Sequence, residues 1–164
     1  MKNVTRNFVL TGLLMLGAGS VCAEVVVNYV HPERFSDFPT DQHDRERAFR
    51  ELTKHFDELG AKLPEGQTLR IDVKDVDLAG REGPKRAVTN LRTYTSLDWP
   101  RIDLQFEIKS SGQTVRSGEA TLRDMEFSSR SKRYYDGDAL RFEKRMLDEW
   151  FDAVVLPSER SARR

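Results

Sequence analysis

The sequence is short of the residues that build covalent frameworks and metal sites: its 164 residues include one cysteine, Cys22, and three histidines. A single cysteine cannot build a disulfide framework. Basic and acidic residues balance at 27 each, so the chain lacks the positive charge typical of nucleic-acid-binding domains. The composition therefore excludes a disulfide-stapled scaffold and gives no support to a nucleic-acid partner.

The N-terminal segment has the three-part layout of a secretory signal peptide. Lys2 and Arg6 form a short positive region, residues 8–16 are almost wholly apolar, and small residues lead up to Ala23. This is the arrangement that a signal peptidase recognises. We predict cleavage after Ala23, which removes residues 1–23 and delivers an exported chain to the periplasm, or beyond it as a secreted protein.

Two other interpretations of this segment are less favoured. Its apolar stretch falls short of the ~20 residues that a membrane-spanning helix needs, so we expect no transmembrane segment in the mature chain. Acylation of Cys22 would make a lipoprotein. However, Gly19 and Val21 stand where lipoprotein signals usually carry Leu and Gly or Ala. Cleavage after Ala23 would leave the mature protein without cysteine.

The rest of the chain predicts one domain, residues 24–156, which we expect to be monomeric. Apolar side chains recur at steps of three and four over 41–59 and 138–155, which predicts two amphipathic helices. The basic tail, 157–164, is expected to be disordered. Strands are predicted where residues are β-branched or alternate between apolar and polar, at 25–30, 69–73, 102–108 and 114–123.

This order of elements predicts an α+β domain of two layers, with both helices on one face of a mostly antiparallel sheet of about four strands. The first two strands, joined through a helix, are expected to be parallel neighbours. The apolar alternation slips at Lys74, where either a β-bulge or the end of the strand would explain it, and again at Gly118, where we predict a bulge. Gly60 is expected to end the first helix in a left-handed conformation.

No residue carries a recognisable catalytic, cofactor-binding or metal-binding motif, and no cofactor is predicted. His43 and His55 fall on one predicted helix with ~18 Å of rise between them, too far for two ligands of one ion. His55 borders the apolar stripe and is expected at the edge of the core. The sequence contains neither a serine-hydrolase elbow nor a phosphate-binding glycine loop.

An acidic cluster, Asp72, Asp75 and Asp77, lies at the end of the second predicted strand. A calcium-binding loop that began at Asp75 would place Ala79 and Arg86 where it needs liganding side chains. The motif therefore fails, and we interpret the three groups as carboxylates at a strand edge.

A basic and aromatic segment, residues 80–100, is the candidate for a ligand or partner surface. It would suit an anionic envelope component such as a lipid headgroup or a polyanion. The alternative is a solvated loop with inward-turned aromatic side chains, since charge runs usually face water. The candidate surface consists of Arg81, Lys85, Arg86, Arg92, Tyr94 and Trp99.

Five stretches together resemble a family of small exported proteobacterial proteins, domain of unknown function 3016. They are "VVVNYVHPERFSD", "VDLAG", "WPRIDLQFEI", "ATLRDMEF" and "FEKRMLDEWF". The resemblance covers nearly all of the mature chain. It implies a single domain in the periplasm or outside the cell, and it implies no activity and no catalytic residue.

Two hypotheses of function remain. The first is a non-catalytic binding or protein-interaction module of the cell envelope, whose partner is another envelope protein or an anionic envelope component. The second is a small hydrolase or metal-assisted enzyme that uses Asp72, Asp75, Asp77 and His31. The second requires that these groups meet in a concave pocket with perturbed pKa values. The absence of catalytic motifs favours the first.

Overall fold

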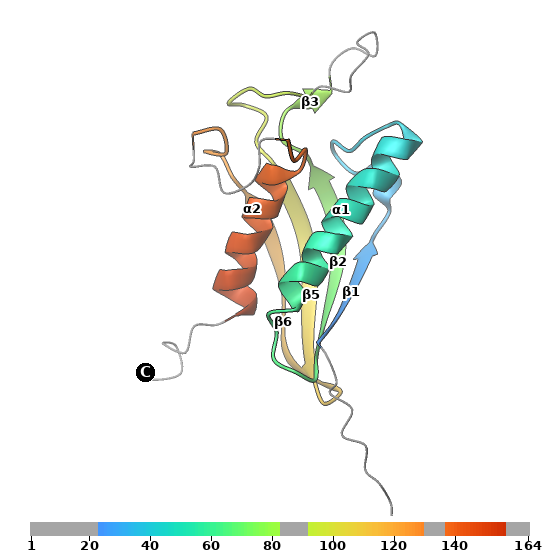
Figure 1. Cartoon of the computed structure of the whole chain (residues 1–164), viewed down its shortest axis with the longest axis vertical. Coiled ribbons are helices and arrows are strands. Elements are labelled where there is room, and N and C mark those ends of the chain that lie inside the picture. Colours follow the sequence, from blue (N-terminus) through green and yellow to red (C-terminus); the bar gives the residue numbers. More distant parts are fainter. Residues whose placement is uncertain (1–22, 83–91, 130–136, 157–164) are drawn as a thin grey trace, which may run out of the picture.

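The computed structural model describes residues 23–82, 92–129 and 137–156 (Figure 1). Almost all of the predicted signal peptide, the whole of the predicted tail, and Lys85 and Arg86 of the candidate surface lie outside these residues. Within them, no helix is both long enough and apolar enough to cross a membrane.

A four-stranded sheet forms one layer of the domain. Its strands lie in the order β1-β2-β5-β6, where β1 is parallel to β2 and the other neighbours are antiparallel. This confirms the predicted α+β class and the parallel first pair. The strands are β1 (Glu24–Tyr29), β2 (Gln67–Asp77), β5 (Arg101–Ser110) and β6 (Gln113–Arg123).

Two helices, α1 (Gln42–Gly60) and α2 (Arg141–Trp150), cover one face of this sheet (Figure 1). The Asp41 carboxylate caps α1 by accepting hydrogen bonds from the backbone of His43 and Asp44. A single π-helical turn, η2 (Phe151–Val155), continues α2 to the end of the described chain.

The core lies between the helices and the covered face of the sheet. On β2, Leu69, Ile71 and Val73 are at most 1% exposed, while Arg70 between them and Lys74 after them are exposed on the open face. The period of two that predicted the strand is therefore the alternation between core and water. The largest buried side chains of the helices and their strand partners include Leu52, Phe56, Leu104, Phe106, Trp150 and Phe151.

The predicted irregularities are partly confirmed. The register of β2 against β5 shifts between Val73 and Asp75, at the expected bulge. The second shift lies opposite Ile108 and Lys109, near Val115, so the bulge predicted at Gly118 was misplaced. Gly118 instead faces the Phe106 ring, and an added Cβ there would lie 3.1 Å from it.

Gly60 does not end α1 in a left-handed conformation, because it is the last helical residue and Ala61 after it keeps right-handed angles. Its missing side chain serves packing. A Cβ at Gly60 would lie 1.9 Å from a methyl carbon of Val25 on β1, so glycine lets the helix end rest directly on the sheet edge.

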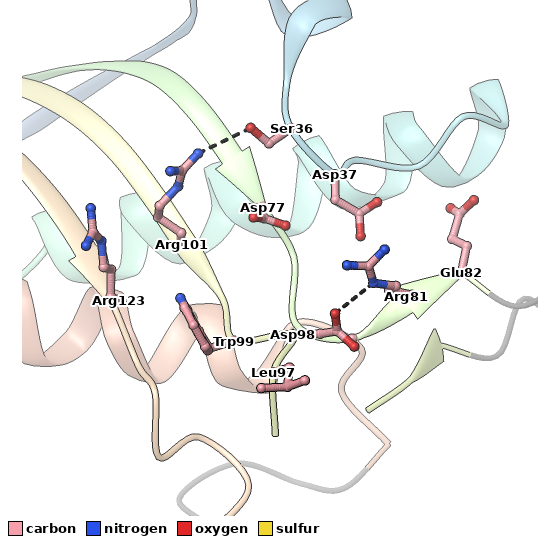
Figure 2. Close-up of a pocket in the computed structure, with 11 residues that line it drawn as sticks. Ser36, Asp37, Asp77, Arg81, Glu82, Leu97, Asp98, Trp99, Arg101 and Arg123 are labelled. Atoms are coloured by element: carbon pink, nitrogen blue, oxygen red, sulfur yellow. Dashed lines mark hydrogen bonds and ion pairs between the residues drawn. The ribbon is translucent and has the colours of Figure 1, made fainter. Parts of the chain in front are cut away.

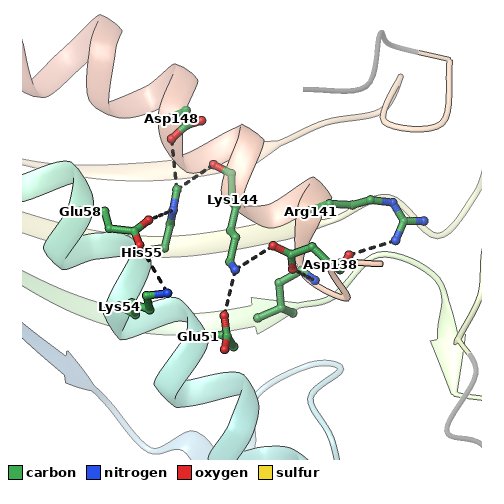
Figure 3. A network of polar contacts seen from close by, with 9 residues as sticks. Glu51, Lys54, His55, Glu58, Asp138, Arg141, Lys144 and Asp148 are labelled. Carbon is green, nitrogen blue, oxygen red and sulfur yellow. Dashed lines mark hydrogen bonds and ion pairs between the residues drawn. The ribbon is translucent and has the colours of Figure 1, made fainter. Parts of the chain in front are cut away.

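The polar side chains of α2 are matched by partners on neighbouring elements, and we call such matched contacts closed (Figure 3). The His55 ring on α1 is 4% exposed, and its Nε2 lies 3.1 Å from both the Lys144 carbonyl and the Asp148 carboxylate. Because both partners are acceptors, Nε2 carries the hydrogen. The Lys144 ammonium donates to Glu51 at 3.0 Å and to Asp138 at 2.8 Å.

Arg145 makes a further closed contact of α2. It is 6% exposed and pairs at 2.6 Å with Asp124, which follows β6 and is equally buried. The same guanidinium donates to the Phe127 carbonyl at 3.0 Å. This pair ties α2 to the turn after the last strand.

A second, small ribbon stands beyond one end of the main sheet. It pairs β3 (Arg81–Glu82) with β4 (Arg92–Thr93) and lies on the same end as a single 3-10 turn, η1 (Pro32–Arg34). The ribbon therefore extends the molecule past this end of the sheet, and Arg81 and Glu82 of β3 line the site described next.

Candidate binding cleft

A cleft of about 670 Å³ opens at the end of the sheet where β2 finishes and β5 begins (Figure 2). Its volume falls in the range of small-molecule sites. Three aspartates and a glutamate meet three arginines in its lining. The acidic members are Asp37, Asp77, Glu82 and Asp98, the basic members are Arg81, Arg101 and Arg123, and Ser36, Gly80, Leu97 and Trp99 complete the wall.

The floor of the cleft is a row of four charged residues set by strand register. In the backbone register, Asp77 on β2 lies opposite Asp37 on one side and opposite Arg101 of β5 on the other. Arg101 in turn lies opposite Arg123 of β6. Two acidic residues are therefore followed by two basic ones across the sheet. Figure 2 shows Arg101 and Arg123 on one side and Asp37 on the other.

Arg101 is neutralised by Asp75, which precedes Asp77 by two residues on β2. The two groups are 2.5 Å apart, and the backbone and hydroxyl of Ser36 each donate to the same carboxylate at 2.7 Å. Burial alone would raise the pKa of Asp75, but the hydrogen bonds from Ser36 and Arg101 outweigh it and lower the pKa. Asp75 is therefore a charged, fixed anchor beside the cleft.

Arg92 of β4 supports the cleft from behind rather than facing the solvent. Its side chain is 11% exposed and pairs with Asp37 at 2.5 Å. It also donates to the carbonyls of Leu78, Ala79 and Gly80 at 3.1, 2.8 and 2.6 Å. One guanidinium thus holds the loop after β2 and the first residue of the charged row in place.

The loop itself depends on Gly80 and on Glu143 of α2. Gly80 has φ of +73°, and a Cβ there would lie 2.6 Å from the Thr93 carbonyl oxygen. Glu143 is 1% exposed and accepts a hydrogen bond from the Ala79 backbone at 2.7 Å. Burial raises the pKa of Glu143. The helix layer therefore supports the cleft from behind.

At the rim, Arg81 and Asp98 form a pair at 2.7 Å, and the Thr95 hydroxyl donates to the same carboxylate at 2.5 Å. The Thr95 and Arg81 hydrogen bonds lower the pKa of Asp98. Arg81 is 80% exposed, so the pair orders the rim while adding little to stability.

Asp77 and Arg123 are left over from this pairing. Among the residues that the structure describes, neither side chain has a hydrogen bond or an ion pair, although Asp77 feels the charges around it. Burial, Asp37 and Asp75 together raise the pKa of Asp77, against the opposing effect of Arg101. An unpaired carboxylate with a raised pKa in a cleft marks a candidate functional group.

The structure brings together only part of each predicted site. Of the basic and aromatic surface, Arg81 and Trp99 line the cleft, and Arg92 lies behind it. Tyr94 packs against Phe142 at 5.3 Å between ring centres, with Arg141 stacked on it.

The acidic cluster is also divided. Asp77 lines the cleft, Asp75 supports it, and Asp72 lies further along the open face, bonded to Asn28 and Arg70. His31 is exposed and contacts Glu33. No group of three or more His, Cys, Asp or Glu with the placement of a metal site occurs in the part of the chain that the structure describes.

Sequence reasoning missed Asp37, Arg101, Arg123 and the supporting Glu143. Arg101 is the first residue of β5, and Arg123 is the last residue of its antiparallel neighbour β6. Counted from the turn, and with the one-residue bulge near Val115 included, the pairing of these strands places them opposite each other. Asp37 and Glu143 reach the site through tertiary contacts that have no sequence signal.

Comparison with known proteins gives a family and no activity. No curated protein matches the chain. Among solved structures, a dodecamer of a PelC variant from Paraburkholderia phytofirmans is similar to it. The identity is 12%, the match covers 77% of this chain and 78% of that one, and the TM-score is 0.33; a likeness so distant carries no argument. A family model described as a protein of unknown function, DUF3016, matches residues 23–153. The resemblance seen in the sequence is thereby confirmed, and the chain belongs to the DUF3016 family.

Proposed function

We propose that this protein is an exported, non-catalytic binding module of the cell envelope, and that the cleft at the end of its sheet holds a small polar ligand. The observation that carries the proposal is the charged row on the cleft floor, in which Asp77 and Arg123 are left without partners among the described residues. Charges that are preorganised but unsatisfied favour a ligand that supplies the missing partners.

The ion pairing of the other cleft carboxylates supports ligand binding rather than catalysis. Asp37, Asp75 and Asp98 are each held by an arginine at 2.5 to 2.7 Å. Such pairs hold each carboxylate in a fixed position, and the pKa values of Asp75 and Asp98 are lowered, which suits the positioning of a ligand and not the transfer of a proton. Trp99 and Leu97 add an apolar wall beside the charges, as small-molecule sites commonly have.

Export to the periplasm is part of the proposal and rests on the N-terminal segment. In the envelope, the module would receive its ligand from the periplasm or hand it to another envelope protein. Mass spectrometry of the exported protein tests this part directly: we expect a chain that begins at Glu24, and an intact chain that begins at Met1 would contradict it.

A second candidate function is favoured by one observation, the raised pKa of Asp77 next to Asp37. A carboxyl group whose pKa is raised is better suited to general acid–base work than an ordinary carboxylate, so a small hydrolase remains the rival. The rival predicts that Asp77→Asn abolishes turnover of a bound compound. The binding module predicts that the compound leaves the protein chemically unchanged.

The proposal is tested by titrating isotopically labelled protein with the low-molecular-mass fraction of a periplasmic extract and following backbone amide shifts by NMR. We expect shifts concentrated at the cleft, at Gly80, Leu97 and Asp98, that reverse on dialysis. The bound compound is then recovered and compared with the input by mass spectrometry.

The matched control is Trp99→Ala, which removes the apolar wall, measured beside Tyr94→Ala, whose ring packs on Phe142 outside the cleft. Weaker cleft shifts in the first variant alone support the site. Amide shifts scattered over the surface, or none at all, would overturn the cleft as the binding site. Recovery of a converted compound would overturn the non-catalytic role and establish the rival.

A further inference from the structure

The charges of the cleft can be paired off one by one to find what a ligand must supply. Asp37 is matched by Arg92, Arg101 by Asp75, and Asp98 by Arg81. What remains on the floor is the carboxylate of Asp77 toward one side and the guanidinium of Arg123 toward the other, with no partner for either among the described residues. The unmatched floor charges are therefore of opposite sign and are separated in the row by Arg101.

A neighbour of like charge makes a ligand group of opposite charge more favourable beside Asp77 and beside Arg123. Asp77 lies directly beside Asp37, and Arg123 lies directly opposite Arg101. Like charges at opposed positions of a sheet destabilise each other. A positive group between the two aspartates and a negative group between the two arginines would relieve both repulsions at once. Glu82 at the rim, on the side of Asp37, adds to the negative end (Figure 2).

The strand register also sets the distance between Asp77 and Arg123, and therefore the length of a ligand that reaches both. Asp77 and Arg123 occupy strands on either side of β5, and neighbouring strands lie about 4.8 Å apart. The backbone positions of the two residues are therefore roughly 10 Å apart. An extended chain advances at most ~3.3–3.6 Å per residue, so about three peptide units cover this distance. A cleft of about 670 Å³ has room for a ligand of that size.

We propose, on the basis of the binding function above, that the ligand of this cleft is a zwitterion of about tripeptide length. Its ammonium group lies beside Asp77 and Asp37, and its carboxylate or other anionic group lies beside Arg123 and Arg101. Leu97 and Trp99 contact the apolar stretch between the two charged ends.

The test measures the affinity of four defined compounds for the exported protein by isothermal titration calorimetry. Triglycine carries both charges, N-acetyltriglycine only the negative one, and triglycine amide only the positive one. Phosphoethanolamine carries both charges at a much shorter spacing and represents a lipid headgroup. We expect triglycine to bind best, and each capped analogue to bind about ten-fold more weakly through the loss of one charge-assisted contact.

Two variants assign each charge of the ligand to its end of the row. In Asp77→Asn the preference for triglycine over N-acetyltriglycine should disappear, while the preference over triglycine amide stays. In Arg123→Gln the reverse is expected. Asp152→Asn and Arg50→Gln are the controls, because both groups are exposed and outside the cleft lining. Thermal unfolding of each variant establishes that it is folded.

The outcomes separate this inference from the function on which it rests. Equal binding of triglycine and either capped analogue, or tighter binding of phosphoethanolamine than of triglycine, overturns the tripeptide-length zwitterion. If periplasmic extract still shifts the cleft amides in that case, the binding function stands. If none of the four compounds binds and the extract gives no cleft shifts, both fail together. The crossed loss of preference in the two variants supports the inference.

Discussion

Two regions of this molecule are built from the same kinds of charged residue and differ in how completely the charges are matched. The contacts of α2 are closed: Lys144 reaches two carboxylates, His55 meets Asp148, and Arg145 pairs with Asp124. The cleft is open, because Asp77 and Arg123 lie in its lining without a partner among the described residues.

The difference shows what each region is arranged to do. A buried charge is expensive unless it is paired and hydrogen-bonded, so the contacts of α2 specify how helices and turn fit together. Charges at the cleft are partly hydrated and cost less to leave unmatched. The sheet register puts them there in a fixed order, and the closed contacts behind them, above all Arg92, hold that order.

The largest expected effect comes from breaking a closed contact. Arg145→Met leaves the Asp124 carboxylate buried without its guanidinium, and breaking a buried pair in this way costs about 3–5 kcal/mol. Chemical denaturation measures the loss. The double variant Asp124→Asn with Arg145→Met removes the stranded charge and should recover part of the stability. A loss below about 1 kcal/mol, the range of surface pairs, would show that this contact is not closed.

The next effect comes from disturbing the wall of the open region. Gly80→Ala forces a side chain onto a residue with φ of +73° and into the Thr93 carbonyl, which should cost roughly 1–3 kcal/mol. Gly66→Ala is the matched control, because Gly66 has φ of +77° but nothing lies within 4 Å of its Cβ position. We expect both variants to be destabilised and only Gly80→Ala to lose cleft binding. Equal behaviour of the two would remove Gly80 from the site.

The sequence was enough to predict the layers of the fold because its signals are local. The alternation along β5 and the stripes of α1 and α2 follow directly from which side chains enter the core. The predictions at Gly60 and Gly118 were wrong because a glycine in a sequence indicates either a special backbone angle or a close contact. At both positions the reason is a neighbour, Val25 or Phe106, that is distant in sequence.

The site was predictable only in fragments for the same reason. Arg81, Trp99 and Asp77 were named from a basic segment and an acidic cluster, each taken as a unit. The cleft instead takes one or two residues from several elements and orders them by strand register. Composition cannot distinguish Arg92, which turns inward to three carbonyls, from Arg123, which lines the cleft.

A smaller effect should appear as a pH dependence of the closed region. Burial lowers the pKa of His55 below its ordinary value of 6.5, although the carboxylates of Asp148 and Glu58 oppose this. The unfolded chain therefore takes up a proton before the folded one does. The stability that neutral His55 contributes is complete above pH 6.5 and is lost as the pH falls below it.

His55→Gln removes this titration. Denaturation at a series of pH values should show a flatter profile below pH 6.5 than the wild type gives, with His43→Gln, exposed on the same helix, following the wild type. A His55→Gln profile as steep as the wild type would place the pH dependence elsewhere.

The smallest expected effect sharpens the comparison most, because it sets two neighbouring aspartates of one strand against each other. Asp75 is matched and Asp77 is not. The raised pKa of Asp77 means that its charge opposes folding once the pH exceeds the ordinary value of 3.8, and the lowered pKa of Asp75 means the opposite. At neutral pH, Asp77→Asn should therefore stabilise the protein by a few tenths of a kcal/mol, while Asp75→Asn destabilises it. Both differences should shrink as the pH falls through the carboxylate range, since protonation makes the same change as the substitution. If the two variants shift stability in the same direction at neutral pH, the cleft is closed like the contacts of α2, and a ligand would have no unmatched charge to meet.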